Sequence, residues 1–263
     1  MEYFIKKLKY TSDELVVLCM HSTPADHNSE FEKIINFLLL HFEPMNPKNL
    51  EQYYSGTMKN GPYVLFTFDD GLKNNLNAAR ALQKKGIYAI FFVVPEFIRS
   101  ARQKEYYLKN IRPITDPDFD KEVEDFTAMS FEDLRQLQQS GHVIGAHTST
   151  HRMTREMNEA ELSGEVIACK ESLTAALGSA PQTFCSINNT SASVSARAKK
   201  MIAENYDFHF TTFPGLNSAA KNKQLIFRRN IEVNWPLSRI KFALGQADFP
   251  RWSSSIQQFR DLA

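Results

Sequence analysis

Residues 63–71 read Tyr63-Val64-Leu65-Phe66-Thr67-Phe68-Asp69-Asp70-Gly71, an apolar run that ends in two adjacent carboxylates and a glycine. Bounded by Gly61-Pro62 and Gly71, the run predicts a short strand buried on both faces. Because an ionised carboxylate is costly to bury, Asp69 and Asp70 are expected at the mouth of the strand, near a cation or hydrogen-bond donors. Asp-Gly is also common in turns, so this stretch alone leaves a simple turn open.

A second polar cluster, His147-Thr148-Ser149-Thr150-His151, also follows an apolar run, which ends at Ala146. In parallel α/β sheets and barrels, the carboxyl ends of the strands share one face, and the chemistry is found there. The two clusters are therefore expected to converge, which favours a functional site over a simple turn.

Length and composition indicate a globular protein with a substantial core. The chain has 263 residues, of which 43% are hydrophobic and 23% charged, values typical of folded soluble domains. The formal net charge of +1 provides no field that would steer the protein onto nucleic acid or anionic lipid.

The sequence pattern also predicts a cytoplasmic protein. Residues 1–10 mix lysines with apolar residues and do not resemble a signal peptide. The longest apolar run, residues 87–94, is much shorter than the about 20 residues that span a bilayer. Cys19, Cys169 and Cys185 are odd in number and lie far apart in apolar contexts, so we expect buried, reduced thiols.

Strand-like and helix-like segments alternate along the chain. Strands are expected at 15–20, 63–68, 87–94, 142–146, 183–187, 208–212 and 230–233, and helices at 31–42, 74–85, 130–139, 159–177, 193–205 and 237–244. Ser29 is the expected N-cap of the first helix, and residues 130–133 have the pattern of a capping box. About seven such βα units predict an α/β fold with a closed barrel in a single domain spanning 1–263. Residues at about 97–128 interrupt the rhythm and are expected to form either a lid or a poorly ordered insertion.

The histidines suggest a metal site. His147 and His151, together with one carboxylate, make the three protein ligands of an open zinc-type site. The remaining carboxylate is then available as a general base. Such histidines are more often ordinary surface residues, but their occurrence with the Asp69-Asp70 pair favours the metal interpretation.

These residues resemble the polysaccharide deacetylases of the NodB-homology type, carbohydrate esterase family 4, over about residues 60–215. Thr67-Phe68-Asp69-Asp70-Gly71 is similar to the first motif of that family, and residues 147–151 to its second. The resemblance implies a distorted (β/α)7 barrel, with Asp69 as general base and with Asp70, His147 and His151 holding a divalent metal. Histidine and carboxylate ligands suit Zn²⁺, and Co²⁺ or Ni²⁺ fit the same ligands.

Two family motifs depart from this pattern. The third, usually Arg-x-Pro-Tyr-Gly, is replaced by Phe184-Cys185-Ser186-Ile187-Asn188-Asn189-Thr190, and no late Leu-x-His follows Phe213. In a permuted branch that includes poly-N-acetylglucosamine deacetylases, the acid histidine comes from an N-terminal strand, which Leu18-Cys19-Met20-His21-Ser22 resembles. His21 is therefore expected to be the general acid.

The same branch often has an arginine that orients the base. Arg228 and Arg229 open the predicted strand that ends at Val233. Because side chains alternate along a strand, only one of the two is expected to face the site.

The resulting prediction is a metal-dependent hydrolase that removes an N-acetyl or similar acyl group from an amino sugar. The N-acylated sugar would belong to a glycan or its biosynthetic intermediate, as in the assembly of surface polysaccharides. The alternative is a catalytically decayed glycan-binding or scaffold protein on the same barrel. A haloacid-dehalogenase-type phosphatase is disfavoured, because its nucleophile loop needs Asp-x-Asp and here the aspartates are adjacent.

Overall fold

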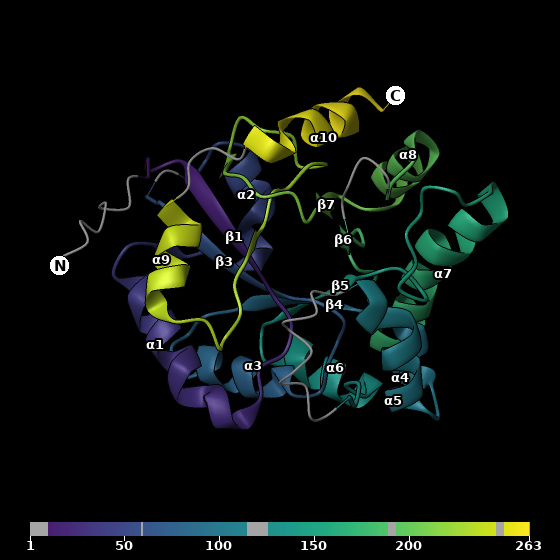
Figure 1. The fold of residues 1–263 in the computed structure, drawn as a ribbon, viewed down its shortest axis with the longest axis horizontal. Coiled ribbons are helices and arrows are strands. Elements are labelled where there is room, and N and C mark those ends of the chain that lie inside the picture. The colour runs from purple at the N-terminus through teal and green to yellow at the C-terminus, as the bar shows by residue number, and fades with distance from the viewer. Residues whose placement is uncertain (1–9, 59, 115–125, 189–192, 246–249, 263) are drawn as a thin grey trace.

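The computed structural model describes residues 10–58, 60–114, 126–188, 193–245 and 250–262. A curled sheet forms its centre (Figure 1), with strands in the order β7-β6-β5-β4-β3-β1-β8. Six strands pair in parallel along this order: β1 Glu14–Met20, β3 Tyr63–Phe68, β4 Ala89–Val93, β5 Val143–Ala146, β6 Thr183–Cys185 and β7 Phe208–Phe210. Short strands β2 Glu43–Pro44, β8 Asn217–Ser218 and β9 Arg229–Asn230 complete the sheet.

The segment that follows β8 closes the gap between β1 and β7. Ile226 makes a parallel bridge to Phe210 in β7, and Arg229 of β9 pairs with Leu18 of β1. The sheet therefore curls into a distorted barrel, and the predicted mixed α/β barrel fold is confirmed. As expected, the carboxyl ends of the parallel strands face the same side.

Helices cover the outside of the sheet (Figure 1). The longer ones are α1 Asn28–Leu39, α3 Asn75–Gln83, α6 Phe131–Gln139, α7 Glu159–Leu177, α8 Ala196–Asn205, α9 Leu237–Gly245 and α10 Pro250–Asp261. The shorter ones are η1 Ala25–His27, η2 Pro47–Asn49, α2 Leu50–Tyr54, α4 Pro95–Arg99, α5 Gln103–Tyr106, η3 Tyr107–Ile111 and η4 Arg112–Ile114.

Local sequence signals explain several helix ends. Ser130 and Asp133 form the expected capping box of α6, in which each side chain accepts a backbone N–H that the helix leaves unpaired. α7 ends at Gly178, whose φ of 75° is the left-handed conformation that glycine adopts without steric cost. The predicted N-cap Ser29 is wrong, because η1 leads directly into α1, which begins at Asn28.

The central strand β3 is buried along its whole length, as its apolar sequence predicts. Its side chains alternate between two cores. Phe66 and Phe68 pack with the outer helices, whereas Leu65 packs inside the barrel with residues such as Phe92. Phe68, the residue before Asp69, stacks on Phe91 with ring centroids 5.0 Å apart, so the strand end that carries the carboxylates is rigidly held.

Two segments differ from the expectations. The predicted strand 230–233 is only the two-residue β9, after which the chain leaves the sheet. The C-terminal segment forms an additional helix, α10, whose signal was the helical spacing of Trp252, Ile256 and Phe259. The described part of the expected lid or insertion, residues 97–114 and 126–128, is mainly helical, and residues 115–125 lie outside the described chain.

Within the described residues, no helix is long and apolar enough to cross a membrane. The three cysteines are free and buried, as the sequence predicts.

Close packing beneath the second polar cluster predicts a sensitive position at Gly145, two residues before His147. A Cβ on Gly145 would lie 2.4 Å from Phe92 Cδ1 and 2.6 Å from Thr183 Oγ1. Gly145→Ala is therefore expected to lower the free energy of unfolding by about 1–3 kcal/mol, the usual cost of overpacking. Urea unfolding followed by circular dichroism measures it.

Gly164→Ala is the matched control, because Gly164 lies within α7 and a Cβ there would have no other atom within 4 Å. This substitution should raise the free energy of unfolding by roughly 0.5–1 kcal/mol, since alanine favours the helix. Equal stability changes in the two variants would contradict the packing argument.

Candidate functional site

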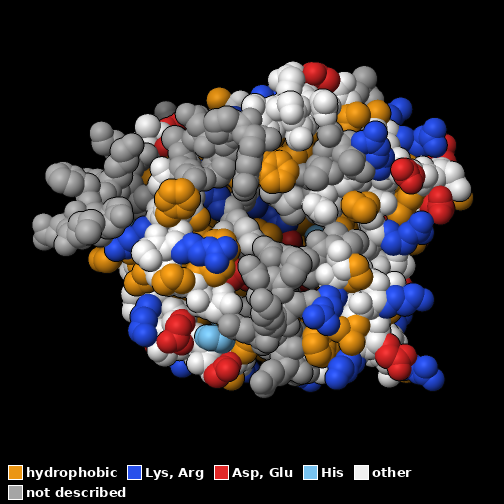
Figure 2. Space-filling view, viewed as in Figure 1, with side chains coloured by type: hydrophobic (Ala, Val, Ile, Leu, Met, Phe, Trp, Pro, Cys, Tyr) orange, Lys and Arg blue, Asp and Glu red, His pale blue; other side chains and the backbone are white. Residues whose placement is uncertain are grey.

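A cavity of about 600 Å³ opens at the carboxyl ends of the parallel strands. Figure 2 shows a hollow near the middle of this face, with acidic and basic side-chain atoms inside it. The predicted catalytic and metal-binding residues His21, Asp69, Asp70, His147 and His151 line the cavity, as does one of the two candidate arginines, Arg228. The other lining residues are Cys19, Ser186, Ile187, Asn188, Thr212, Asn230 and Trp252. His21 follows β1, the two aspartates follow β3, and His147 follows β5.

Asp70, His147 and His151 form a cluster that is suited to a metal ion. Their candidate ligand atoms all lie within 4.8 Å of one another. Asp70 Oδ1 is 3.1 Å from Nε2 of His151 and 3.6 Å from Nε2 of His147. All three side chains are buried, with exposed fractions of 1–3%.

Backbone carbonyls orient both imidazole rings. The His147 Nδ1 lies 2.8 Å from the carbonyl oxygen of Cys185, and the His151 Nδ1 lies 3.2 Å from that of Asn110. Since a carbonyl only accepts, each Nδ1 must carry the proton and donate it. In the neutral imidazole the Nε2 lone pairs then face Asp70, and this is the tautomer that a metal-binding histidine requires.

Two further observations fit a cation at this cluster. Neither carboxylate oxygen of Asp70 has a hydrogen-bond partner among the described residues, although both are buried, and such a group is costly without a compensating charge. Asp70 and His151 also have positive φ angles of 71° and 67°. Left-handed backbone is uncommon for these residues and concentrates at functional sites.

The other carboxylate, Asp69, is held in a buried ion pair. Nη1 and Nη2 of Arg228 donate to its Oδ1 and Oδ2, each over 2.7 Å. Although burial alone would raise the pKa of Asp69, the charge of Arg228 and its hydrogen bonds lower it to about 2. Asp69 is therefore ionised at neutral pH. Its Oδ2 also accepts from the thiols of Cys19 and Cys185, so Oδ1 is the oxygen that keeps a second lone pair.

Of the two candidate arginines, Arg228 faces the site. Its guanidinium also donates to Thr67 Oγ1 and to the Thr211 carbonyl. Arg229 points away and donates to the carbonyls of Ala243 and Leu244 near the end of α9. The alternation expected from the sequence is thus present, with Arg229 fastening α9.

His21 is paired with a carboxylate that the sequence reading missed. Its Nδ1 lies 3.0 Å from Oε1 of Glu232. Burial opposes a charge on the imidazole, but the charge of Glu232 and its hydrogen bond outweigh burial and raise the pKa of His21 to about 9. Glu232 lies in the irregular stretch after β9. Because a strand was predicted over 230–233, the sequence did not indicate that Glu232 would contact His21.

Two other groups of residues could offer metal ligands, and both are less suitable. They are Cys19, His21 and Asp69, and Asp69, His147 and Cys185. Both include Asp69, whose oxygens already accept from Arg228. Burial raises the pKa of both cysteine thiols, and only the thiolate binds metal well. The Asp70 cluster is therefore the best candidate metal site among the described residues.

The chain is similar to known deacetylases in sequence pattern and in fold. The model of the polysaccharide deacetylase family matches residues 57–204. No curated protein matches. Among solved structures, IcaB from Ammonifex degensii has a TM-score of 0.69 at 21% identity, covering 89% of this chain and 97% of that one.

Two more solved structures are similar. The Streptococcus pyogenes deacetylase PplD in complex with acetate has a TM-score of 0.68 at 15% identity, with coverage of 90% of this chain and 100% of that one. The deacetylase domain of BpsB from Bordetella bronchiseptica has a TM-score of 0.65 at 14% identity, with coverage of 85% and 98%. At these identities the structures establish the shared fold. Because the family model spans more than half of the sequence, including both carboxylates and both site histidines, this chain belongs to the polysaccharide deacetylase family.

Proposed function

We propose that the protein is a metal-dependent hydrolase that removes an N-acetyl or similar acyl group from an amino sugar. Membership of the family supports deacetylation of a sugar. The observation that carries the finer proposal is the meeting, in one cavity, of the Asp70 cluster with two differently tuned groups, Asp69 and His21. One is held charged as an acceptor and the other is held charged as a donor, which is the division that acid–base hydrolysis needs.

Asp70, His147 and His151 would hold the divalent cation, with Zn²⁺ favoured and Co²⁺ or Ni²⁺ also compatible with these ligands. When bound, the cation supplies Lewis-acid polarisation of the acyl carbonyl and acidifies water. The protein side of the site is arranged for this, because both Nε2 atoms and an otherwise unpartnered carboxylate face one another.

Asp69 is the proposed general base. It accepts a proton from the water whose oxygen attacks the acyl carbon, while Arg228 holds the carboxylate in place through two hydrogen bonds. The bidentate pair leaves little rotational freedom, so a lone pair of Asp69 is kept aimed into the cavity.

His21 is the proposed general acid. An amine is a poor leaving group unless it is protonated, so cleavage of the C–N bond requires a donor that is charged near neutral pH. With its pKa raised to about 9 by Glu232, the imidazolium meets this requirement and delivers its proton to the departing nitrogen. The products are the carboxylic acid, acetate for an acetyl group, and the free amino sugar.

A catalytically decayed glycan-binding protein is the second candidate. The altered third motif favours it, because in its described part, residues 184–188, only Ser186, Ile187 and Asn188 line the cavity. Measuring acetate release from N-acetylated amino-sugar oligomers together with the metal content separates the two: bound metal without release would support the decayed protein. The cytoplasmic location and the role in surface-polysaccharide assembly stay predictions from the sequence.

Removing one histidine tests the proposed metal ligands. His147→Ala is expected to reduce bound zinc from about one ion per chain to nearly none, because it removes one of three protein ligands. The fold should persist, since the ring is replaced at a cavity wall. Elemental analysis of zinc-loaded, dialysed protein provides the measurement, and His41→Ala, an exposed position beyond α1, is the control. Wild-type zinc content in His147→Ala would refute the assignment.

The second prediction separates base from ligand. Asp69→Asn should cut amide hydrolysis about 10²–10⁴-fold, the usual contribution of a general base, while retaining zinc. Because Arg228 loses its buried counter-charge, the free energy of unfolding should also fall, by up to about 3–5 kcal/mol. Asp70→Asn should instead lose zinc. If both variants lost zinc equally, the two roles could not be divided in this way.

The third prediction concerns the pH profile. Glu232→Gln removes the charge that raises the pKa of His21, so this pKa should fall. A general acid is active only while it is protonated, below its pKa. As the pH is raised, the variant should therefore lose activity at a lower pH than the wild type. The alkaline limb of kcat for amide hydrolysis, measured by acetate release, should therefore move toward neutrality.

An activated ester distinguishes this effect from a general defect. Its leaving group departs without a proton, so hydrolysis of 4-nitrophenyl acetate should keep its wild-type alkaline limb in Glu232→Gln. His21→Ala should likewise lose far more amide than ester activity. Equal losses on amide and ester would show that His21 is not the acid.

A further inference from the structure

The catalytic cavity has an aromatic wall that comes from the C-terminal helix. Among the described residues lining the cavity, Trp252 is the one aromatic side chain other than the histidines. It lies in the first turn of α10, well beyond the family-matched residues 57–204. The sequence reading assigned no element and no role to this region.

α10 is fastened to the barrel by buried contacts. Phe259 is only 1% exposed and packs against the rings of Phe213 and His209, with centroids 5.6 and 5.7 Å away. His209 is itself the middle residue of β7. The helix end is therefore anchored directly on the sheet, and Figure 1 shows α10 lying next to the β7 side of the molecule.

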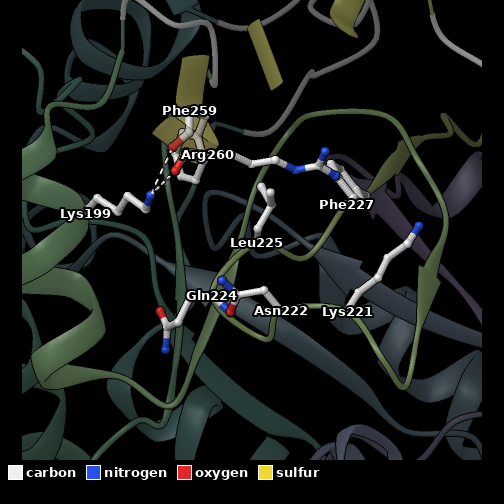
Figure 3. A pocket seen from close by; sticks show the side chains of 8 residues that line it. All are labelled: Lys199, Lys221, Asn222, Gln224, Leu225, Phe227, Phe259 and Arg260. Carbon is white, nitrogen blue, oxygen red and sulfur yellow. Dashed lines mark hydrogen bonds between the residues drawn. The ribbon is translucent and has the colours of Figure 1, made fainter. Parts of the chain in front are cut away.

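Lys199 binds the C-terminal end of the same helix. The Lys199 ammonium donates to the carbonyl oxygens of Phe259, Arg260 and Leu262 over 3.1, 3.0 and 2.6 Å. Figure 3 shows Lys199 reaching from α8 toward Phe259 and Arg260. The last carbonyls of a helix lack partners within the helix, and a cation there also offsets the helix dipole. Lys199 therefore holds the C-terminal end of α10 against α8.

Packing also places the indole of Trp252. Its ring meets Phe213 edge to face, with centroids 6.1 Å apart and an interplanar angle of 71°. Phe213 follows Thr212, which lines the cavity next to the end of β7. The half-buried indole is thus supported from behind and faces the same cavity as the proposed base and acid.

We propose that Trp252 stacks on the apolar C–H face of a pyranose ring, so that α10 forms the sugar-binding wall of the cavity. This inference rests on the proposed function, since it assigns the sugar its place in that site. A sugar ring has one face rich in C–H groups and polar hydroxyls at its edge. The indole supplies a flat apolar surface, and the polar side chains of Asn188, Thr212 and Asn230 line the same cavity for the hydroxyls.

Fluorescence tests this contact directly, because the chain has only two tryptophans. Trp235→Phe leaves Trp252 as the single tryptophan, which excitation at long wavelength selects over the nine tyrosines. Trp235 stacks on Arg239 and does not line the cavity. Titrating this full-length variant with an N-acetylglucosamine tetramer should give a saturable change in emission intensity and wavelength. Buffer alone and an unrelated polyol such as sorbitol provide the controls and should give none.

Kinetics test the consequence for the substrate. Trp252→Ala should raise KM for acetate release from the tetramer about tenfold relative to KM for 4-nitrophenyl acetate, the order expected for losing one large aromatic contact. Trp252→Phe keeps a ring and should recover most of the affinity, which guards against a folding defect. Trp235→Phe should match the wild type.

Lys199→Met tests whether the hydrogen bonds from Lys199 hold α10 in place. It keeps most of the length of the side chain but removes the three hydrogen bonds to the end of α10 and to Leu262, the residue that follows it. In the Trp235→Phe background it should shift Trp252 emission to longer wavelength and raise KM for the tetramer by a smaller factor than Trp252→Ala. A wild-type emission and KM would overturn the anchoring role.

The outcomes separate this inference from the proposed function. Acetate release with neither an emission change nor a KM effect in Trp252→Ala would overturn the sugar wall and leave the hydrolase intact. A saturable emission change without acetate release would support the wall and overturn the hydrolase. No emission change and no release would overturn both.

Discussion

The buried ion pair between Asp69 and Arg228 is the constraint on which the site depends. It joins the end of the central strand β3 to the segment that closes the barrel, at exposed fractions of 2% and 1%. Removing either partner would leave an uncompensated buried charge, which costs several kcal/mol. The same two hydrogen bonds that help close the barrel also keep the proposed base ionised, so structural and chemical roles coincide in one contact.

Backbone groups around the second cluster orient the candidate metal ligands. Carbonyl oxygens from the ends of two different segments accept from Nδ1 of His147 and His151. Each ring thereby presents Nε2 to the same carboxylate. The left-handed conformations of Asp70 and His151 place these side chains where extended or helical backbone would not, and strain of that kind persists only where the surrounding structure holds it.

The family-matched span and its flanks contribute different parts of the site. Residues 57–204 contain the proposed base and the three candidate ligands. The proposed acid His21, its partner Glu232, the tethering Arg228 and the aromatic Trp252 all lie outside that span. The described chain thus surrounds the candidate site with elements from both sides of the family-matched span.

The barrel and the two polar clusters at strand ends could be predicted from the sequence alone, because alternating βα patterns and strand-end positions depend on local periodicity. The sequence also identified His21, since a residue that ends a buried parallel strand must lie at the common face. The choice between Arg228 and Arg229, the partner of His21 and the wall formed by Trp252 were decided only in the tertiary structure. Each depends on a contact between segments far apart in the chain, in irregular backbone or a separate helix, where sequence spacing no longer specifies direction.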